Sequence, residues 1–137
     1  MKAVIDTSAW YAWFNDADPH YEEVKSVLSN LPLELFILST VFNELIALLF
    51  NRKGKTVAVK AGEVLLGLGL RDLEKQEESD AWKLFKQSKA DISYVDCTIV
   101  VLARKLVLPI FTFDKHFKDL GLETVPISNP MIKEDLL

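Results

Sequence analysis

The segment KAVIDTSAW, residues 2–10, runs from a short apolar stretch directly into an acidic side chain. Its apolar part, residues 3–5, is typical of a strand that is buried on both faces of a sheet. Asp6 follows at the carboxyl end of this strand, and the hydroxyl residues Thr7 and Ser8 come next. A carboxylate at the end of a core strand is costly to bury unless hydrogen bonds or a cation compensate for its charge. The end of this strand is therefore a candidate functional position.

The composition of the 137 residues is that of an ordinary globular protein, with 50% hydrophobic and 26% charged side chains. We therefore expect a single domain over residues 1–137. The N-terminus lacks a signal-peptide pattern, and no apolar run reaches the roughly 20 residues of a membrane helix. The lone Cys97 excludes an internal disulfide and a cysteine-based metal cluster. These features predict a cytoplasmic protein without a membrane partner.

The net charge of −4 limits how the protein could bind nucleic acid. Proteins that do so through overall surface charge are usually basic. Any contact with phosphate groups must therefore be local or assisted by a bound cation.

Strand-like and helix-like segments alternate along the chain. The expected strands are residues 3–5, 33–38, 71–75, 108–113 and 123–127, and the expected helices are residues 19–31, 41–51, 55–70, 77–88 and 93–105. This alternation predicts a central, mostly parallel sheet of four to five strands with helices on both faces. The expected fold class is thus α/β, with residues 71–75 as a polar edge strand.

Two helix starts carry capping signals in the sequence. Asp18 followed by Pro19 predicts an N-cap and the first helical position. Ser39 or Thr40 is expected to cap the following helix.

Two stretches are rich in aromatic side chains. Residues 77–88 are expected to form an amphipathic helix whose apolar face comprises Ala81, Trp82 and Phe85. The stretch at residues 10–14 holds four aromatic side chains, namely Trp10, Tyr11, Trp13 and Phe14. Core packing, a dimer surface and a groove for a partner protein remain alternatives for these four, and stacking on nucleic-acid bases is the least favoured.

Four acidic residues that lie far apart in the sequence are expected at one edge of the sheet. Asp6 and Asp114 each follow a predicted strand, and parallel strands end at the edge where α/β proteins bind ligands. Glu44 and Asp96 lie near the starts of two apolar helices. Structural alternatives remain for both, because Glu44 suits a solvent-exposed helix start and Asp96 completes a capping box with Ser93.

A cluster of four carboxylates is unfavourable unless protons or cations neutralise it. Two such charges 4 Å apart repel by about 1 kcal/mol in water and by roughly four times as much near a protein surface. With oxygen ligands alone, the ions that fit best are Mg²⁺ and Mn²⁺. A carboxylate-bound Mg²⁺ keeps several waters and recruits phosphate oxygens, which indicates phosphodiester chemistry.

Four motifs together resemble the PIN-domain ribonuclease family, and most closely the VapC toxins of VapBC toxin–antitoxin systems. They are VIDTSAW at 4–10, STVFNELIALL at 39–49, SYVDCTIVVLA at 93–103 and IFTFDKHF at 110–117. The resemblance spans nearly the whole chain and implies a three-layer α/β/α PIN fold. It also implies a metal-dependent endoribonuclease that leaves 5′-phosphate and 3′-hydroxyl ends, with an RNA substrate, a cognate antitoxin and a homodimeric state.

Carried over to this sequence, the resemblance implies an acidic catalytic site formed by Asp6, Glu44, Asp96 and Asp114. Asp6 and Asp96 would be the most direct ligands of Mg²⁺ or Mn²⁺, and Asp114 would ligate the ion directly or through water. Glu44 would act through water or orient the nucleophile. The hydroxyls of Thr7, Ser8 and Thr112 would hold these carboxylates in place. Turn chemistry alone is an alternative explanation for Thr7 and Ser8.

Positively charged side chains near the acids are weaker signals. A basic cluster follows the Glu44 helix and comprises Arg52, Lys53, Lys55 and Lys60, and His116 lies two residues after Asp114. These side chains could contact an RNA backbone. Cations also suit a helix C-terminus, and a surface histidine is ordinary, so both interpretations stay open.

Two other functions remain open. A non-catalytic interaction or RNA-binding module would keep the fold without the chemistry. A phosphatase that works through an aspartyl-phosphate would need a second aspartate two positions after Asp6, where this chain has Ser8. Metal dependence separates the nuclease from the binding module, because only the nuclease loses its activity in EDTA and regains it with Mn²⁺.

Overall fold

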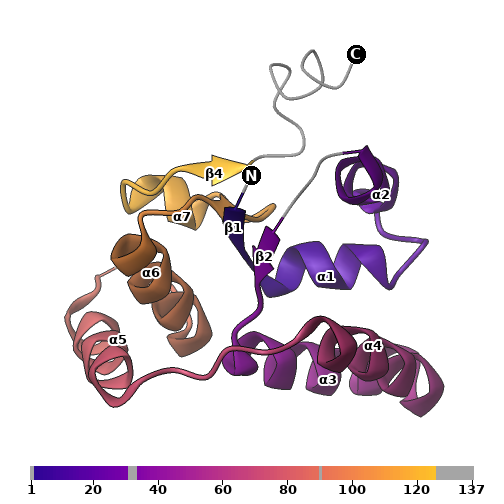
Figure 1. Cartoon of the computed structure of the whole chain (residues 1–137), viewed down its shortest axis with the longest axis horizontal. Coiled ribbons are helices and arrows are strands. Elements are labelled where there is room, and N and C mark those ends of the chain that lie inside the picture. The colour runs from indigo at the N-terminus through magenta and orange to yellow at the C-terminus, as the bar shows by residue number, and fades with distance from the viewer. Residues whose placement is uncertain (1, 31–33, 90, 126–137) are drawn as a thin grey trace.

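The computed structural model describes residues 2–30, 34–89 and 91–125, and its centre is a sheet of four parallel strands in the order β2-β1-β3-β4 (Figure 1). The strands are β1 (Lys2–Ile5), β2 (Glu34–Phe36), β3 (Ile110–Phe111) and β4 (Thr124–Val125). The helices are α1 (Thr7–Trp13), α2 (Tyr21–Asn30), α3 (Ser39–Lys53), α4 (Lys55–Leu68), α5 (Lys75–Gln87), α6 (Tyr94–Leu106) and α7 (His116–Asp119). The predicted parallel sheet with alternating helices is confirmed.

Helices lie on both sides of the sheet. In Figure 1, α5 and α6 stand to the left of β1 and β2, α1 and α2 to the right, and α3 with α4 below. Helix α1 contacts α2 and α3, whereas α6 contacts β1 and α5. The arrangement is the three-layer α/β/α architecture.

The inner strand β1 forms the centre of the core. Val4 pairs with Phe36 of β2 on one side and with Ile110 of β3 on the other. Residues 3–5 and 110–111 have no exposed surface, which explains why these strands are apolar throughout rather than alternating. Because all four strands are parallel, their carboxyl ends share one edge.

Helix α1 was not expected, and it accounts for the aromatic-rich stretch at residues 10–14. The helix begins at Thr7 because Asp6, directly after β1, is its N-cap. Trp10 is buried in the core, and three partly buried rings pack against that core, those of Tyr11, Trp13 and Phe14. Core packing is therefore the alternative that the structure supports for this stretch.

Two predicted helix starts are wrong. Helix α2 begins at Tyr21 rather than Pro19, because the Asp18 side chain accepts a 2.8 Å hydrogen bond from the His20 N–H and forms a turn before the helix. Helix α3 has Leu38 as its N-cap, without a side-chain capping bond. Ser39 is already helical, and its N–H donates to the Arg71 carbonyl oxygen at 3.0 Å.

The predicted edge strand at residues 71–75 is also wrong. Arg71 forms a single parallel bridge with Leu38, and α5 begins soon afterwards at Lys75. The strands expected at 33–38 and 108–113 are shorter, covering 34–36 and 110–111. The last expected strand is present at residues 124–125, and its remaining positions 126–127 lie outside the described residues.

The apolar face expected for α5 is only partly buried. Ala81 has no exposed surface, but Trp82 is 52% and Phe85 is 40% exposed. The helix is held to the rest of the fold at its other end, where the buried Glu77 carboxylate accepts two hydrogen bonds from the Arg71 guanidinium, at 2.8 and 2.9 Å. The Lys105 ammonium lies 3.0 Å from the same carboxylate.

No helix among the residues described is long and apolar enough to cross a membrane.

Candidate active site

Asp6 stands where β1 ends and α1 begins, and this position fixes its side chain. One carboxylate oxygen, Oδ1, accepts a 2.7 Å hydrogen bond from the Thr7 backbone N–H. The other, Oδ2, accepts from the Ser8 hydroxyl at 3.0 Å and from the Thr112 hydroxyl at 2.7 Å. Asp6 is only 4% exposed, so these three donors supply the hydrogen bonds that water would otherwise provide.

The hydroxyls of Ser8 and Thr112 tie the ends of β1 and β3 together. Their oxygens lie 3.3 Å apart. Ser8 also accepts a hydrogen bond from the Phe113 N–H at 3.2 Å, and Thr112 accepts one from the Asp114 N–H at 2.9 Å. The segment that carries Asp114 is thus held against the segment that carries Asp6, as their positions after parallel strands predict.

Thr7 contributes to this network in a different way from the expected one. Its backbone N–H bonds to Asp6, whereas its buried hydroxyl has no hydrogen-bond partner among the residues described. Because Thr7 follows Asp6 directly, the sequence indicated a contact between them, but it did not show whether the hydroxyl or the backbone N–H of Thr7 makes it.

Asp96 is both a capping residue and a neighbour of the other acids, the two interpretations that the sequence left open. It is the third residue of α6 and completes a capping box, in which its Oδ2 accepts from the Ser93 N–H at 3.2 Å and its own N–H donates to the Ser93 hydroxyl at 3.1 Å. Burial raises the pKa of the Asp96 carboxyl, and the negative charges of Asp114 and Glu44 raise it further. The capping role therefore coexists with closeness to the other acids.

Glu44 and Asp114 are half-buried at the same edge. Glu44 lies in the second turn of α3 and forms no hydrogen bond or ion pair within the described part of the chain. Asp114 accepts a hydrogen bond from the His116 N–H at 2.9 Å, and the His116 ring nitrogen Nδ1 lies 2.9 Å from the same oxygen. Asp96 lies near enough to the other three acids for their charges to interact: its charge raises the pKa of Asp6, and the charges of Asp114 and Glu44 raise its own pKa.

The pKa of the Asp6 carboxyl is strongly raised. Burial is the main reason that its pKa is raised to about 6, and the negative charge of Asp96 adds to the rise. The hydrogen bonds from Thr112, Ser8 and the Thr7 N–H lower the pKa and partly offset the effect of burial. An ionised Asp6 is therefore costly at neutral pH unless positive charge is brought to it.

A divalent cation fits this edge in charge and in donor chemistry. The donors are carboxylate oxygens with hydroxyls behind them, and hard ions such as Mg²⁺ and Mn²⁺ prefer oxygen ligands. Within residues 2–30, 34–89 and 91–125, however, no three His, Cys, Asp or Glu side chains are already placed around a common metal position. Holding an ion would require the partly exposed acids to turn toward Asp6.

Four of the predicted basic residues follow Glu44 by eight or more positions, and the fifth, His116, lies beside Asp114. Arg52, Lys53, Lys55 and Lys60 are exposed where α3 ends and α4 begins. Arg52 is about two helical turns beyond Glu44, and its guanidinium lies 5.4 Å from the centre of the Tyr11 ring. His116 is half-exposed beside Asp114. A contact between these side chains and RNA stays a prediction.

One local pattern at the site was missed in the sequence. From Thr112 to His116, each alternate residue bonds to the N–H two positions later: Thr112 to Asp114, and Asp114 to His116. Ser, Thr and Asp commonly form such turns. The alternate positions of Thr112 and Asp114 in TFDKH could therefore have predicted them.

Comparison with known proteins identifies the family of this chain. A family model of the PIN domain matches residues 3–122, and the chain belongs to that family. Among solved structures, VapC20 of Mycobacterium tuberculosis, a toxin that cleaves the sarcin–ricin loop, is 27% identical with a TM-score of 0.81, covering 90% of this chain and 98% of that chain.

Two less similar structures share the fold. FitAB bound to an IR36 DNA fragment is 17% identical with a TM-score of 0.67, covering 93% of this chain and 95% of that chain. VapBC-1 from nontypeable Haemophilus influenzae is 19% identical with a TM-score of 0.64, covering 94% of this chain and all (100%) of that chain. Comparison with curated protein sequences finds no match.

Proposed function

We propose that this protein is a Mg²⁺- or Mn²⁺-dependent endoribonuclease and the toxin of a toxin–antitoxin pair. The observation that carries the proposal is the hydrogen-bond network that joins Asp6 and the Asp114 backbone through the Thr112 hydroxyl at the carboxyl edge of a PIN-family sheet. The charge of Asp96 is near enough to raise the pKa of Asp6. Capping explains Asp6 and Asp96 individually, but it does not require Glu44 and Asp114 near them, so the group of four indicates a cation-binding function. The likeness to VapC20, a toxin that cleaves the sarcin–ricin loop, supports the choice of RNA as substrate.

Asp6, Asp96 and Asp114 are the residues that would hold the metal. When bound, the ion would supply positive charge at the scissile phosphate and lower the pKa of a bound water. The chain's own contribution is to orient its ligands: three hydrogen bonds fix the Asp6 carboxylate, and the capping box with Ser93 fixes one oxygen of Asp96. Glu44, which has no partner among the described residues, is free to accept a proton from the attacking water or to orient it.

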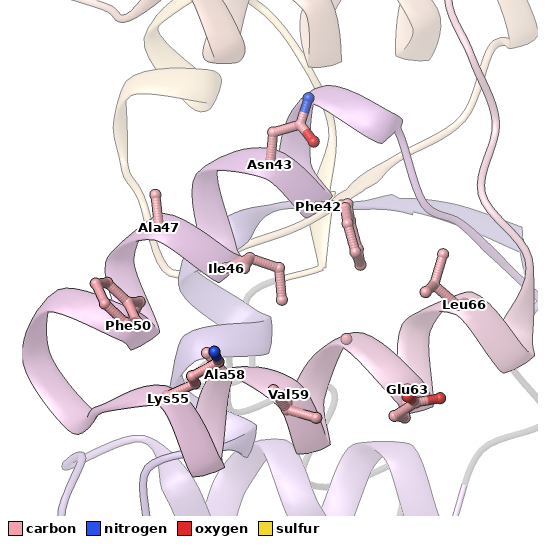
Figure 2. Close-up of a pocket in the computed structure, with 11 residues that line it drawn as sticks. Phe42, Asn43, Ile46, Ala47, Phe50, Lys55, Ala58, Val59, Glu63 and Leu66 are labelled. Carbon is pink, nitrogen blue, oxygen red and sulfur yellow. The ribbon is translucent and has the colours of Figure 1, made fainter.

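An antitoxin is the partner protein that we propose, and a homodimer is the proposed state of the free toxin. The surface supports a protein partner, because an apolar groove of about 580 Å³ runs between α3 and α4 (Figure 2). Phe42 and Ile46 extend into it from α3, and Val59 and Leu66 line it from α4. Val59 is 51% and Leu66 is 58% exposed, which is unfavourable unless another protein covers them.

A non-catalytic RNA-binding or interaction module is the second candidate. It is favoured by one observation, that no three acids within the described ranges are already arranged around a metal position. Metal binding and cleavage separate the two candidates.

The test compares the parent with Asp6→Asn and Asp96→Asn in cleavage of a fluorogenic RNA and in calorimetric titration with Mn²⁺. We expect the parent to cut RNA, to lose activity in EDTA and to regain it with Mn²⁺, and both variants to fold but to lose cleavage and weaken Mn²⁺ binding. Asp119→Asn, an exposed aspartate on α7, is the control and should behave like the parent. A parent that binds no Mn²⁺, or variants that cut as well as the parent, would contradict the proposal.

A further inference from the structure

Three aromatic rings gather on the outside of the molecule, on α5 and at the start of α6. The ring centres of Trp82 and Phe85 are 5.9 Å apart, and Tyr94 lies 6.2 Å from Trp82 and 6.0 Å from Phe85. Trp82 is 52% and Phe85 is 40% exposed, and Tyr94 is half-buried. We refer to these three residues as the aromatic trio.

The aromatic trio lies at the end of α6 that carries Asp96. Helices α5 and α6 run antiparallel, because Glu77 near the start of α5 pairs with Lys105 near the end of α6, whereas Trp82 meets Tyr94 at its beginning. Tyr94 and Asp96 belong to the same first turn of α6. Since a helix with its side chains is only about 10 Å across, nucleotides flanking a phosphate at Asp96 could reach the trio.

One lysine shares the face of α5 that carries Trp82, and two others are near it in the sequence. Lys86 lies four residues after Trp82, so the two side chains share a face, and Lys83 and Lys89 lie close by in the sequence. These three lysines are exposed and form no ion pair with the residues described. Lys105, in contrast, pairs with Glu74 and Glu77 at the opposite end of α5.

We propose that the aromatic trio and Lys86 form a stacking surface for unpaired bases of RNA beside the acidic edge. This inference rests on the proposed function. Aromatic rings bind unpaired bases by stacking, whereas paired bases within a duplex hide their faces. A chain with a net charge of −4 also needs local cations to attract phosphates, and Lys86, on the same face as Trp82, supplies one.

The test measures RNA binding without cleavage. In an Asp6→Asn background and without divalent ions, we expect a fluorescein-labelled single-stranded RNA to bind more tightly than the same RNA annealed to its complement. Trp82→Ala and Phe85→Ala should each weaken single-strand binding about tenfold. Trp82→Phe should retain most of the binding and Trp82→Leu should not, because leucine restores apolar area without an aromatic face.

Two further variants sharpen the test. Lys86→Ala should reduce the slope of log K against log salt by about 0.7, the value for one phosphate contact with a single strand. Leu68→Ala is the matched control, because Leu68 is 61% exposed on α4 and is not part of the trio, and it should bind RNA like its background.

The outcomes separate this inference from the proposed function. If the parent cuts RNA but Trp82→Ala and Phe85→Ala bind it as before, the stacking surface is wrong and the nuclease stands. If the substitutions instead convert a dimer into a monomer in light scattering, the trio is a subunit interface and the inference is overturned. A protein that neither binds nor cuts RNA overturns both.

Discussion

The Thr112 hydroxyl donates a 2.7 Å hydrogen bond to Oδ2 of Asp6, although the two residues are 106 positions apart. The same hydroxyl oxygen accepts the Asp114 N–H at 2.9 Å. One side chain therefore orients an acid at the end of β1 and the backbone of an acid that follows β3. Hydrogen bonds to a metal-binding carboxylate set its orientation. Thr112 is therefore expected to matter for both stability and cation binding.

Thr112→Val tests this role by removing the hydroxyl while keeping the shape of the side chain. Asp6 then loses one donor and the Asp114 N–H loses its acceptor, so we expect the free energy of unfolding to fall by about 1–3 kcal/mol. We also expect Mn²⁺ affinity and RNA cleavage to fall by roughly 10- to 100-fold. Chemical denaturation, calorimetry and cleavage assays measure the three quantities.

The control for this prediction is Thr124→Val. The Thr124 hydroxyl is buried without a hydrogen-bond partner among the described residues, so its removal should leave stability unchanged or raise it. Equal losses in both variants would show that the Thr112 hydrogen bonds have no special role.

The two roles of Asp96 can be separated by substitution on each side of the capping box. Ser93→Ala removes the acceptor for the Asp96 N–H and should cost about 1 kcal/mol of stability while leaving the Asp96 carboxylate available for Mn²⁺. Asp96→Asn retains an oxygen that can accept from the Ser93 N–H, so we expect near-parent melting but little Mn²⁺ binding or cleavage. The reverse pattern, with the larger effect on melting in Asp96→Asn and on metal binding in Ser93→Ala, would show that capping is the main role of Asp96.

The Glu77–Arg71 ion pair predicts how the free energy of unfolding depends on pH at acidic values. Hydrogen bonds from Arg71 are the main cause that lowers the pKa of Glu77 to about 2 from its ordinary value of 4.5. The unfolded chain takes up this proton first, so the contribution to stability is complete above about pH 4.5 and is lost as the pH falls toward 2.

Glu77→Gln should therefore lower the free energy of unfolding at pH 7 and flatten its dependence on pH between 4.5 and 2. We expect a loss of about 2 kcal/mol, because Arg71 and Lys105 are partly exposed and solvent weakens their effect. Urea denaturation across this pH range measures both effects. Glu78→Gln, at the exposed neighbouring position, should change neither. If Glu77→Gln kept the parent's pH dependence of stability, the role given to the Glu77–Arg71 pair would be wrong.

The groove between α3 and α4 can be tested as the antitoxin surface with two matched variants of α4. Leu66→Glu places a charge among the apolar side chains of the groove, so we expect complex formation with a co-expressed antitoxin to be lost. Leu68→Glu introduces the same charge at a similarly exposed position outside the groove and should co-purify with the antitoxin like the parent. Loss of the homodimer rather than of the complex would identify the groove as the subunit interface instead.

The sequence by itself determined the parallel sheet and the edge at which the acids lie. Ala3, Val4 and Ile5 are apolar without alternation because β1 is covered on both faces, and this local pattern is visible without a structure. Once the strands are parallel, residues that directly follow them, such as Asp6 and Asp114, must share an edge. The capping box of Ser93 and Asp96 is equally local, since both partners lie within one helical turn.

Only the tertiary structure decided which of these groups touch and which apolar side chains stay exposed. The Thr112–Asp6 bond and the Glu77–Arg71 pair depend on how separate elements pack, and no short sequence pattern encodes such a distance. Trp82 and Phe85 have the spacing of a buried helical face, yet they remain exposed because α6 covers Ala81 and leaves the outer side of α5 open. Periodicity reports which side chains can be buried together, whereas the neighbouring element determines which of them are.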